Sequence, residues 1–348
     1  MAVSDDPSAI AHNPAGLTSL KGTNVYNGIC ATILSSKYTS PNGHLEETVP
    51  QVFFPPNSFL TSDFGFDSVA FGLGIYSPFG IGGRKWSNSG LTRFASTENL
   101  IGTAMINPTF AWRVLPQLSL GVGLDILYSS NTMATMVDQS PLAAGAGRLS
   151  FKGAGFGVGC NLGLLLFPGE KLSFAFAYRS AIRVNHEGSL ALERIAPPLQ
   201  PVLGGGVFRT DANIALTFPH KFSWGLAYRP IPEVTLALDL EWFWWSSFKR
   251  PTLYLENEIP AAQLTDSPIA FDWKNSLLLT AGVDYKICDR FSLRGGYVFQ
   301  QTPVPERTLS PGNPDSDQHY LSLGFGFRPG KWVIDGFYAI GFFLNRKA

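Results

Sequence analysis

The sequence predicts an all-β fold: a transmembrane antiparallel β-barrel with a short N-terminal plug. Two patterns predict it, a repeated alternation of large apolar with small or polar residues and an alternation between short and long connections. The composition agrees with them. Of 348 residues only 15% are charged and 13% are aromatic, and the 36 glycines and 25 prolines are spread along the chain. Helical soluble enzymes rarely have this composition.

The alternation has the period of two that belongs to a strand with two different faces. In 172–179, Leu, Phe, Phe and Tyr alternate with Ser, Ala, Ala and Arg, and the same pattern recurs in 118–126, 234–241 and 321–328. One face of such a strand suits lipid and the other suits a polar or crowded lumen.

The connections predict which rim of the barrel faces which side of the membrane. Short ones lie at 115–117, 168–171, 230–233, 288–290 and 329–331, and long ones near 81–100, 131–149, 190–208, 248–270 and 303–318. Short turns are typical of the periplasmic rim of an outer-membrane barrel. About thirteen strands are visible, near 24–38, 51–61, 66–81, 101–115, 117–131, 150–167, 171–189, 209–229, 233–247, 271–287, 290–303, 318–329 and 331–345.

No apolar run approaches the roughly 20 residues of a membrane-spanning helix, so a membrane location requires a closed barrel. Aromatic residues gather near strand ends, as in 242–245, which fits interfacial girdles. A soluble β-sandwich with a large aromatic core is the alternative. The paired loop lengths argue against it.

Little in the sequence supports catalysis or metal binding. The five histidines are scattered, and none lies in a motif that pairs it with a serine or cysteine nucleophile. The three cysteines are far apart, without disulfide or metal-ligand spacing. We expect no enzyme activity, no cofactor and no metal, with an outer-membrane lipase as a distant alternative. Lys+Arg and Asp+Glu both number 26, so we expect no nucleic-acid partner.

Two motifs carry a family resemblance. The first is Asn13-Pro14-Ala15-Gly16 near the start, and the second is Pro303-Val304-Pro305-Glu306 followed by Asn313-Pro314-Asp315-Ser316-Asp317. In this order and spacing they resemble the FadL-type outer-membrane transporters of long-chain fatty acids and other hydrophobic compounds (OmpP1/FadL/TodX).

The resemblance implies a barrel of about fourteen strands with its N-terminal segment folded inside. We therefore expect residues 1–20 to form a plug, with Asn13, Pro14, Ala15 and Gly16 as its motif. We expect this plug to be incomplete in the present sequence. Residues 21–348 are expected to form the barrel. Because about thirteen strands are visible and the family has about fourteen, we expect the closing strand to be missing.

The resemblance also implies a function. A hydrophobic ligand, most simply a long-chain fatty acid, would be captured by extracellular loops and leave sideways through a kinked third strand. The corresponding residues are Ser77, Pro78, Phe79 and Gly80. Proline cannot donate to a ladder and glycine weakens a strand, so pairing should fail there, although the same residues could simply end the strand. Asn107-Pro108 in the next strand is a second expected interruption.

Arg179 and Arg294 are the residues that we expect to contact a ligand carboxylate. Uptake of aromatic hydrocarbons and a nonspecific porin are the alternatives to fatty acid transport. The sparse charge on inward positions argues against a porin. The partners expected are a hydrophobic small molecule and outer-membrane lipid, around a monomer in the cell outer membrane.

Overall fold

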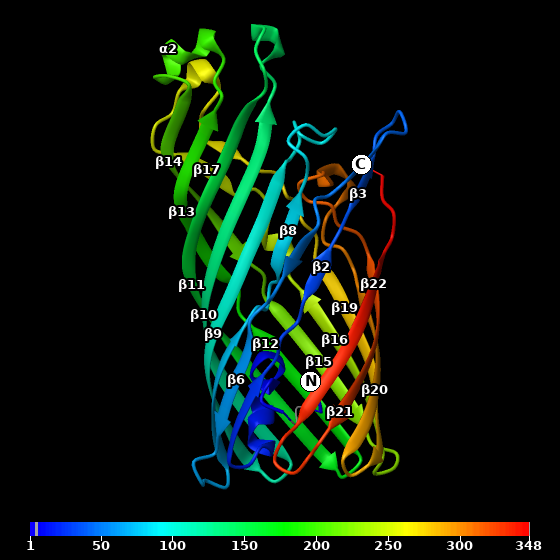
Figure 1. Cartoon of the computed structure of the whole chain (residues 1–348). Coiled ribbons are helices and arrows are strands. Elements are labelled where there is room, and N and C mark those ends of the chain that lie inside the picture. The colour runs from blue at the N-terminus through cyan, green and yellow to red at the C-terminus, as the bar shows by residue number, and fades with distance from the viewer. Residues whose placement is uncertain (4–5, 348) are drawn as a thin grey trace.

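The computed structural model describes residues 1–3 and 6–347 and is a tall β-barrel with a short coil inside one end (Figure 1). Its wall strands are β1 (Thr23–Asn27), β6 (Asn57–Ser62), β7 (Val69–Tyr76), β8 (Ile81–Lys85), β9 (Glu98–Leu115), β10 (Leu118–Val137), β11 (Gly147–Gly169), β12 (Leu172–Arg179), β13 (Ile182–Glu193), β14 (Val207–Phe218), β15 (Lys221–Tyr228), β16 (Val234–Phe243), β19 (Ser276–Cys288), β20 (Phe291–Gln300), β21 (Gln318–Phe327) and β22 (Ile334–Phe343).

Shorter elements form the plug and the loops. Inside the barrel lie α1 (Ala9–His12) and the 3-10 helix η1 (Pro14–Ser19). Two short segments, β17 (Thr252–Leu255) and β18 (Ser267–Pro268), extend the wall sheet beyond β16 and β19. The loops carry β2 (Thr32–Leu34), β3 (Lys37–Thr39), β4 (Leu45–Glu47), β5 (Gln51–Phe53), α2 (Gln200–Leu203), η2 (Ser140–Leu142), η3 (Pro197–Leu199), η4 (Trp245–Ser247), η5 (Pro260–Ala262) and η6 (Glu306–Thr308).

The strand segments join, in the described part of the chain, into thirteen wall strands in sequence order. Five of them are broken in the middle, as β7 with β8, β12 with β13, β14 with β15, β16 with β17, and β18 with β19, and all neighbouring pairs are antiparallel. The prediction of about thirteen strands in an antiparallel barrel is confirmed. Two predicted strand ends are wrong: the strand predicted at 24–38 leaves the wall at Asn27, and β10 continues to Val137, into a predicted loop.

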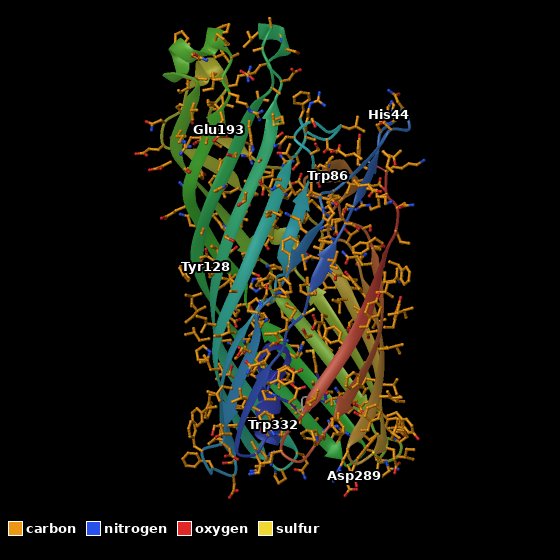
Figure 2. The ribbon with its side chains drawn as sticks, viewed as in Figure 1. His44, Trp86, Tyr128, Glu193, Asp289 and Trp332 are labelled. Carbon is orange, nitrogen blue, oxygen red and sulfur yellow. The ribbon has the colours of Figure 1, made fainter. Side chains whose placement is uncertain are left out.

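The two faces of the wall differ as the alternation predicts. In β9, the inward Met105, Asn107 and Ala111 are fully buried, whereas the outward Ile106 and Trp112 are 44% and 48% exposed. Tyr128 lies on the outside of the wall, about halfway along it (Figure 2). The outer face is therefore a continuous apolar surface of the kind that lipid covers.

The strand number has a geometric consequence at the seam. Because every neighbour is antiparallel, the thirteenth strand, β22, runs in the same direction as the first, β1. Among the described residues no register joins these two strands. A fourteenth closing strand stays a prediction. No helix in the described part of the chain is long and apolar enough to cross a bilayer.

Candidate functional site: a plug, a constriction and a gap in the wall

The N-terminal segment lies in the lumen at the end of the barrel that carries the short turns (Figure 1). Asn13 is fully buried. Its side-chain amide donates to the Leu164 carbonyl at 3.0 Å, and its side-chain oxygen accepts from the Ala15 amide at 3.2 Å. Thr18 hydrogen bonds to Ser119 of β10 at 2.7 Å. The motif residues Asn13, Pro14, Ala15 and Gly16 are all buried, so the structure places this motif where the resemblance implies a plug.

Glycines in the wall make room for this plug. A Cβ added at Gly121 of β10 would stand 2.4 Å from the Ala15 nitrogen, and one at Gly163 of β11 would stand 2.1 Å from the Asn13 side-chain oxygen. Real Cβ atoms do not approach so closely. The glycines of these strands therefore leave room on the inner wall for the N-terminal segment.

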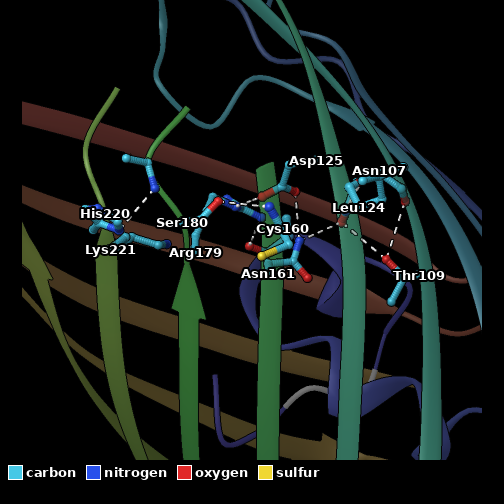
Figure 3. A network of polar contacts seen from close by, with 12 residues as sticks. Asn107, Thr109, Leu124, Asp125, Cys160, Asn161, Arg179, Ser180, His220 and Lys221 are labelled. Atoms are coloured by element: carbon cyan, nitrogen blue, oxygen red, sulfur yellow. Dashed lines mark hydrogen bonds and ion pairs between the residues drawn. The ribbon is translucent and has the colours of Figure 1, made fainter. Parts of the chain in front are cut away.

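A buried polar network joins four wall strands, β9, β10, β11 and β12, just above the plug (Figure 3). Arg179 donates from Nε to Asp125 at 3.0 Å, and the two residues are 4% and 0% exposed. Asn161 donates to Asp125 at 2.8 Å and to Asn107 at 3.1 Å. Arg179 also donates to the Ala11 carbonyl at 3.4 Å, which ties the network to α1.

The network engages Arg179 through both Nε and Nη2, since its guanidinium also donates to the Tyr76 hydroxyl at 2.5 Å. Arg294 is in a similar position, held by Asp284 at 2.6 Å and Asp335 at 2.7 Å. It lines a cavity of about 630 Å³ between the plug and β16, β19 and β20. A ligand carboxylate would have to displace an aspartate at either arginine, and their role as carboxylate contacts stays a prediction.

The predicted kink interrupts the third wall strand. Pairing of β7 with β9 ends at Tyr76↔Met105, and pairing of β8 with β9 begins at Ile81↔Gly102. Four residues, 77–80, thus stand opposite two, 103–104. The Ser77 and Thr103 hydroxyls bond at 2.9 Å, and Thr103 also donates to the Gly80 carbonyl at 2.6 Å, which tethers the extra loop at its ends.

The other side of the same strand is unpaired over a longer stretch. Pairing with β6 ends at Tyr76↔Asn57, and the next backbone hydrogen bond between the two segments runs from the Val49 amide to the Lys85 carbonyl at 2.7 Å. We call the stretch between these points, with 50–56 on one side and 77–84 on the other, the ladder gap. Within it, β5 pairs with β2 instead of β8.

Sequence reasoning missed half of the ladder gap. Pro50, Pro55 and Pro56 lie on the side opposite the kink and have no amide hydrogen to donate. Asn107-Pro108, by contrast, does not open the wall. Pro108 pairs in regular register with β7, and on the β10 side the Asn107 side chain donates to the Leu124 carbonyl at 2.9 Å in place of a ladder bond.

The kink projects into the lumen and narrows it. Phe79 stacks on Phe218 of β14, with ring centroids 4.7 Å apart, although four wall strands separate β14 from β8. Ile182 and Val184 of β13 pack in the same buried cluster. We call the group of these four side chains the constriction; it belongs to the same buried cluster as Ile10 and Leu17 of the plug.

Glycines allow β13 to enter the lumen as well. A Cβ at Gly155 would stand 2.0 Å from the Asn185 carbonyl, and one at Gly157 would stand 2.7 Å from the Ile182 side chain. These glycines therefore relieve crowding between β11 and β13 inside the barrel.

Above the constriction the lumen is apolar. Phe151, Ile214, Leu216 and Phe248 belong to one buried cluster that reaches from β11 and β14 to the loop after β16. Trp273 stacks on Phe248 with centroids 4.7 Å apart. The side chains that face a molecule entering from the loop end are thus hydrophobic and aromatic.

An ion-pair cluster braces the loops around this apolar lumen. Asp272 accepts hydrogen bonds from Arg250 at 3.1 and 3.0 Å and forms an ion pair with Arg307 at 3.4 Å. The hydrogen bonds from Arg250 hold the pKa of the Asp272 carboxyl below its usual range. The cluster connects the loop between β16 and β19 to the loop before β21.

One histidine does meet a serine in space. His186 hydrogen bonds to Ser129 at 2.9 Å and to the Ile214 carbonyl at 3.3 Å, and both side chains are fully buried. No carboxylate bonds to this histidine within the described residues. The two side chains satisfy each other's hydrogen-bonding groups inside the wall, and the pair lacks the third group of a hydrolase triad.

Together these features define a class: an outer-membrane β-barrel whose lumen is closed by an internal plug and whose wall has a break beside an inward kink. The family model described as outer membrane protein transport protein (OMPP1/FadL/TodX) matches residues 1–341, and the chain belongs to this family. Its members are transport proteins of the outer membrane, which confirms the predicted location and the prediction that the chain is not an enzyme.

Individual relatives are distant but nearly full length. The long-chain fatty acid transport proteins of Salmonella typhi and Escherichia coli K12 are 24% and 22% identical, over 93% of this chain and 78% and 79% of theirs. A Pseudomonas aeruginosa FadL homologue has the same fold, with a TM-score of 0.82 at 21% identity over 98% of this chain and 86% of its own. The Ralstonia pickettii toluene transporter TbuX follows at 0.75 and 17% identity, over 98% and 89%.

Proposed function

We propose that this member of the family takes up long-chain fatty acids and releases them sideways into the outer membrane through the ladder gap. The observation that carries this route is the gap itself, with prolines at 50, 55 and 56 facing the unpaired kink at 77–80. Missing donors on one side and extra residues on the other leave a stretch of wall that no backbone ladder seals.

The lumen supports a lateral route over a straight one. A ligand that enters between the extracellular loops meets the apolar cluster around Phe151 and Phe248, then the constriction at Phe79 and Phe218. Below lie the fully buried Asp125 network and the plug. An alkyl chain would leave an apolar environment for a polar one if it continued downward, but would reach lipid if it turned at the kink.

Two alternatives share part of this geometry. An aromatic hydrocarbon could use the same route, and the fold likeness to a toluene transporter is compatible with it. A nonspecific porin fits less well, because a porin needs an open polar channel and this lumen holds a coil and a buried apolar constriction. The long-chain fatty acid transport proteins among the sequence relatives favour the fatty acid. Action as a monomer surrounded by outer-membrane lipid belongs to the same proposal.

The register on either side of the kink determines which deletion tests the route. Tyr76↔Met105 and Ile81↔Gly102 differ by two residues in register, so deleting Pro78 and Gly80 lets β7 and β8 form one continuous strand against β9. Substituting Gly80 by valine would be a poorer test, since its φ of +87° strains any branched residue. We expect the double deletion to fold, to seal the gap and to lower uptake at least about tenfold.

Uptake is measured in vesicles with a lipopolysaccharide outer leaflet and albumin inside as the acceptor, using labelled oleate and labelled toluene. Deletion of Ala143 and Ala144, in the turn between β10 and β11, is the matched control and should leave uptake unchanged. Oleate uptake by a folded kink deletion at the wild-type rate would refute the lateral route. Toluene uptake without oleate uptake by the wild type would refute the fatty acid.

A further inference from the structure

Arg84 is an inward-facing arginine in β8, at the extracellular end of the ladder gap. It stands opposite Asn99 in the β8–β9 register, two residues along from the Gly82↔Ile101 pair. Ile101 packs against the buried apolar clusters of the lumen, so residues in phase with it point inward. Arg84 therefore presents its side chain to the interior just beyond the kink.

The guanidinium of Arg84 has spare hydrogen-bonding capacity. Its Nε donates to the Ser36 hydroxyl at 2.6 Å, and Nη1 donates to the Gly83 carbonyl at 3.2 Å. A guanidinium has about five N–H donors, so about three have no acceptor among the described residues. No carboxylate of the described chain lies within ion-pair distance of it, in contrast to Arg179 and Arg294.

The acidic residue with an electrostatic influence on Arg84 is engaged elsewhere. Asp315 accepts hydrogen bonds from Thr302 at 2.5 Å and Gln318 at 2.9 Å. It is not an ion-pair partner of Arg84, and its charge stabilises the cation from a distance. Burying an arginine without a contacting anion costs desolvation free energy, so such arginines are rare in protein interiors unless a ligand supplies the anion.

Apolar side chains adjoin this cation along the gap. A Cβ at Gly82, the next inward position before Arg84, would stand 3.2 Å from the side chains of Leu34 and Phe53. Phe79 of the constriction lies a few residues further back along the same strand. Apolar side chains therefore lie at Phe79 and beside Gly82, and the cation of Arg84 follows two residues beyond, an order that matches an amphiphile.

We propose that Arg84 binds the carboxylate of a fatty acid whose alkyl chain lies in the ladder gap, and so selects acids over neutral hydrocarbons at the exit. The proposal rests on the proposed fatty acid function. A planar guanidinium can hold a carboxylate through two parallel hydrogen bonds while the tail passes into lipid. Neutral hydrocarbons gain nothing from it.

The test compares oleate with oleyl alcohol, which has the same tail but no charge, in the same albumin-filled vesicles at pH 8. We expect Arg84→Gln to lower the initial rate of oleate uptake by about tenfold, the lower range for losing a charged hydrogen bond. Oleyl alcohol uptake should change less than about twofold. Arg84→Lys should restore part of the oleate rate, because it returns the charge without the planar fork.

Arg93→Gln is the matched control. Arg93 also has no carboxylate partner within the described residues, but it lies in an exterior loop with its guanidinium over the Phe94 ring at 4.3 Å. A parallel fall of oleate and oleyl alcohol in Arg84→Gln would overturn the proposal and leave a structural role. Unchanged oleate uptake in that variant would place the carboxylate elsewhere. Failure of the wild type to carry oleate at all would instead refute the fatty acid function itself.

Discussion

Removal of the Asp125 carboxylate should destabilise the barrel far more than removal of an exposed one. In Asp125→Ala, the guanidinium of Arg179 stays buried, 4% exposed, and loses its 3.0 Å ion pair, while Asn161 loses an acceptor. Breaking one side of a buried pair costs about 3–5 kcal/mol. With a urea dependence of about 3 kcal/mol/M, the unfolding midpoint should fall by about 1–1.7 M.

Asp284→Ala is the control, because Asp284 also pairs with an arginine but is 36% exposed, and Arg294 keeps Asp335 as a second partner. An exposed pair of this kind is worth about 0–1 kcal/mol. Urea unfolding in detergent, followed by tryptophan fluorescence and heat-modifiable migration on gels, measures both variants. Combining Asp125→Leu with Arg179→Met should recover most of the loss, since no charge is left buried. Equal midpoints for the two single variants, or a double variant as unstable as Asp125→Ala, would refute this reasoning.

Two further predictions concern the plug and the loops. Gly163→Ala should displace the plug, because the new Cβ would stand 2.1 Å from the Asn13 side-chain oxygen. A thiol placed at residue 6 should then react faster with a bulky maleimide. Gly282→Ala is the control and should have no effect, since its Cβ would have its nearest neighbour at 3.6 Å. Asp272→Asn should increase protease cleavage of the extracellular loops at neutral pH. In the wild type the Arg250 hydrogen bonds lower the pKa of Asp272, so this bracing is complete above the unfolded pKa of about 3.9 and is lost as pH falls through the lower folded value. Cleavage of the variant should show no such pH dependence, and an unchanged dependence would assign it to another group.

The strand pattern was readable from the sequence because each wall strand has its own two-faced alternation. The short turns were readable for the same reason, since they fall between alternating segments. The outer end of β10 was not, because residues 131–137 lack the regular alternation of large apolar with small or polar residues. Polarity alone therefore resembled a loop there.

The sequence predicts those parts of the candidate site that a single segment determines. Pro78 and Gly80 indicate a break by their own backbone chemistry, and Asn13-Pro14 indicates the plug through a local motif. The partners of these segments depend on register between distant strands. Nothing in the sequence near Asp125 indicates that Arg179 lies 3.0 Å away, or that Phe79 reaches Phe218 across the lumen. For the same reason Arg84, whose guanidinium has no contacting carboxylate among the described residues, was not singled out.

The prolines at 50, 55 and 56 were within reach of sequence reasoning. Pro55 and Pro56 stand in the predicted strand at 51–61 and Pro50 directly precedes it, and a missing donor in a strand marks an edge or a break. Their effect became visible only when the register set them opposite the kink, which requires knowing that β6 stops pairing at Asn57. A single broken strand can be repaired by its neighbour, as Asn107 does for Pro108, whereas two broken strands side by side leave a gap.

The path of the ligand can be measured directly with a fatty acid that carries a photoreactive diazirine near its terminal methyl group. The protein is illuminated during uptake in lipopolysaccharide-faced vesicles, and the labelled peptides are identified by mass spectrometry. Lateral release predicts label on 50–56 and 77–84, on both sides of the ladder gap, and loss of that label when Pro78 and Gly80 are deleted. Label confined to residues 6–20 and to the cavity around Arg294 would show passage past the plug toward the periplasm and would contradict the lateral route.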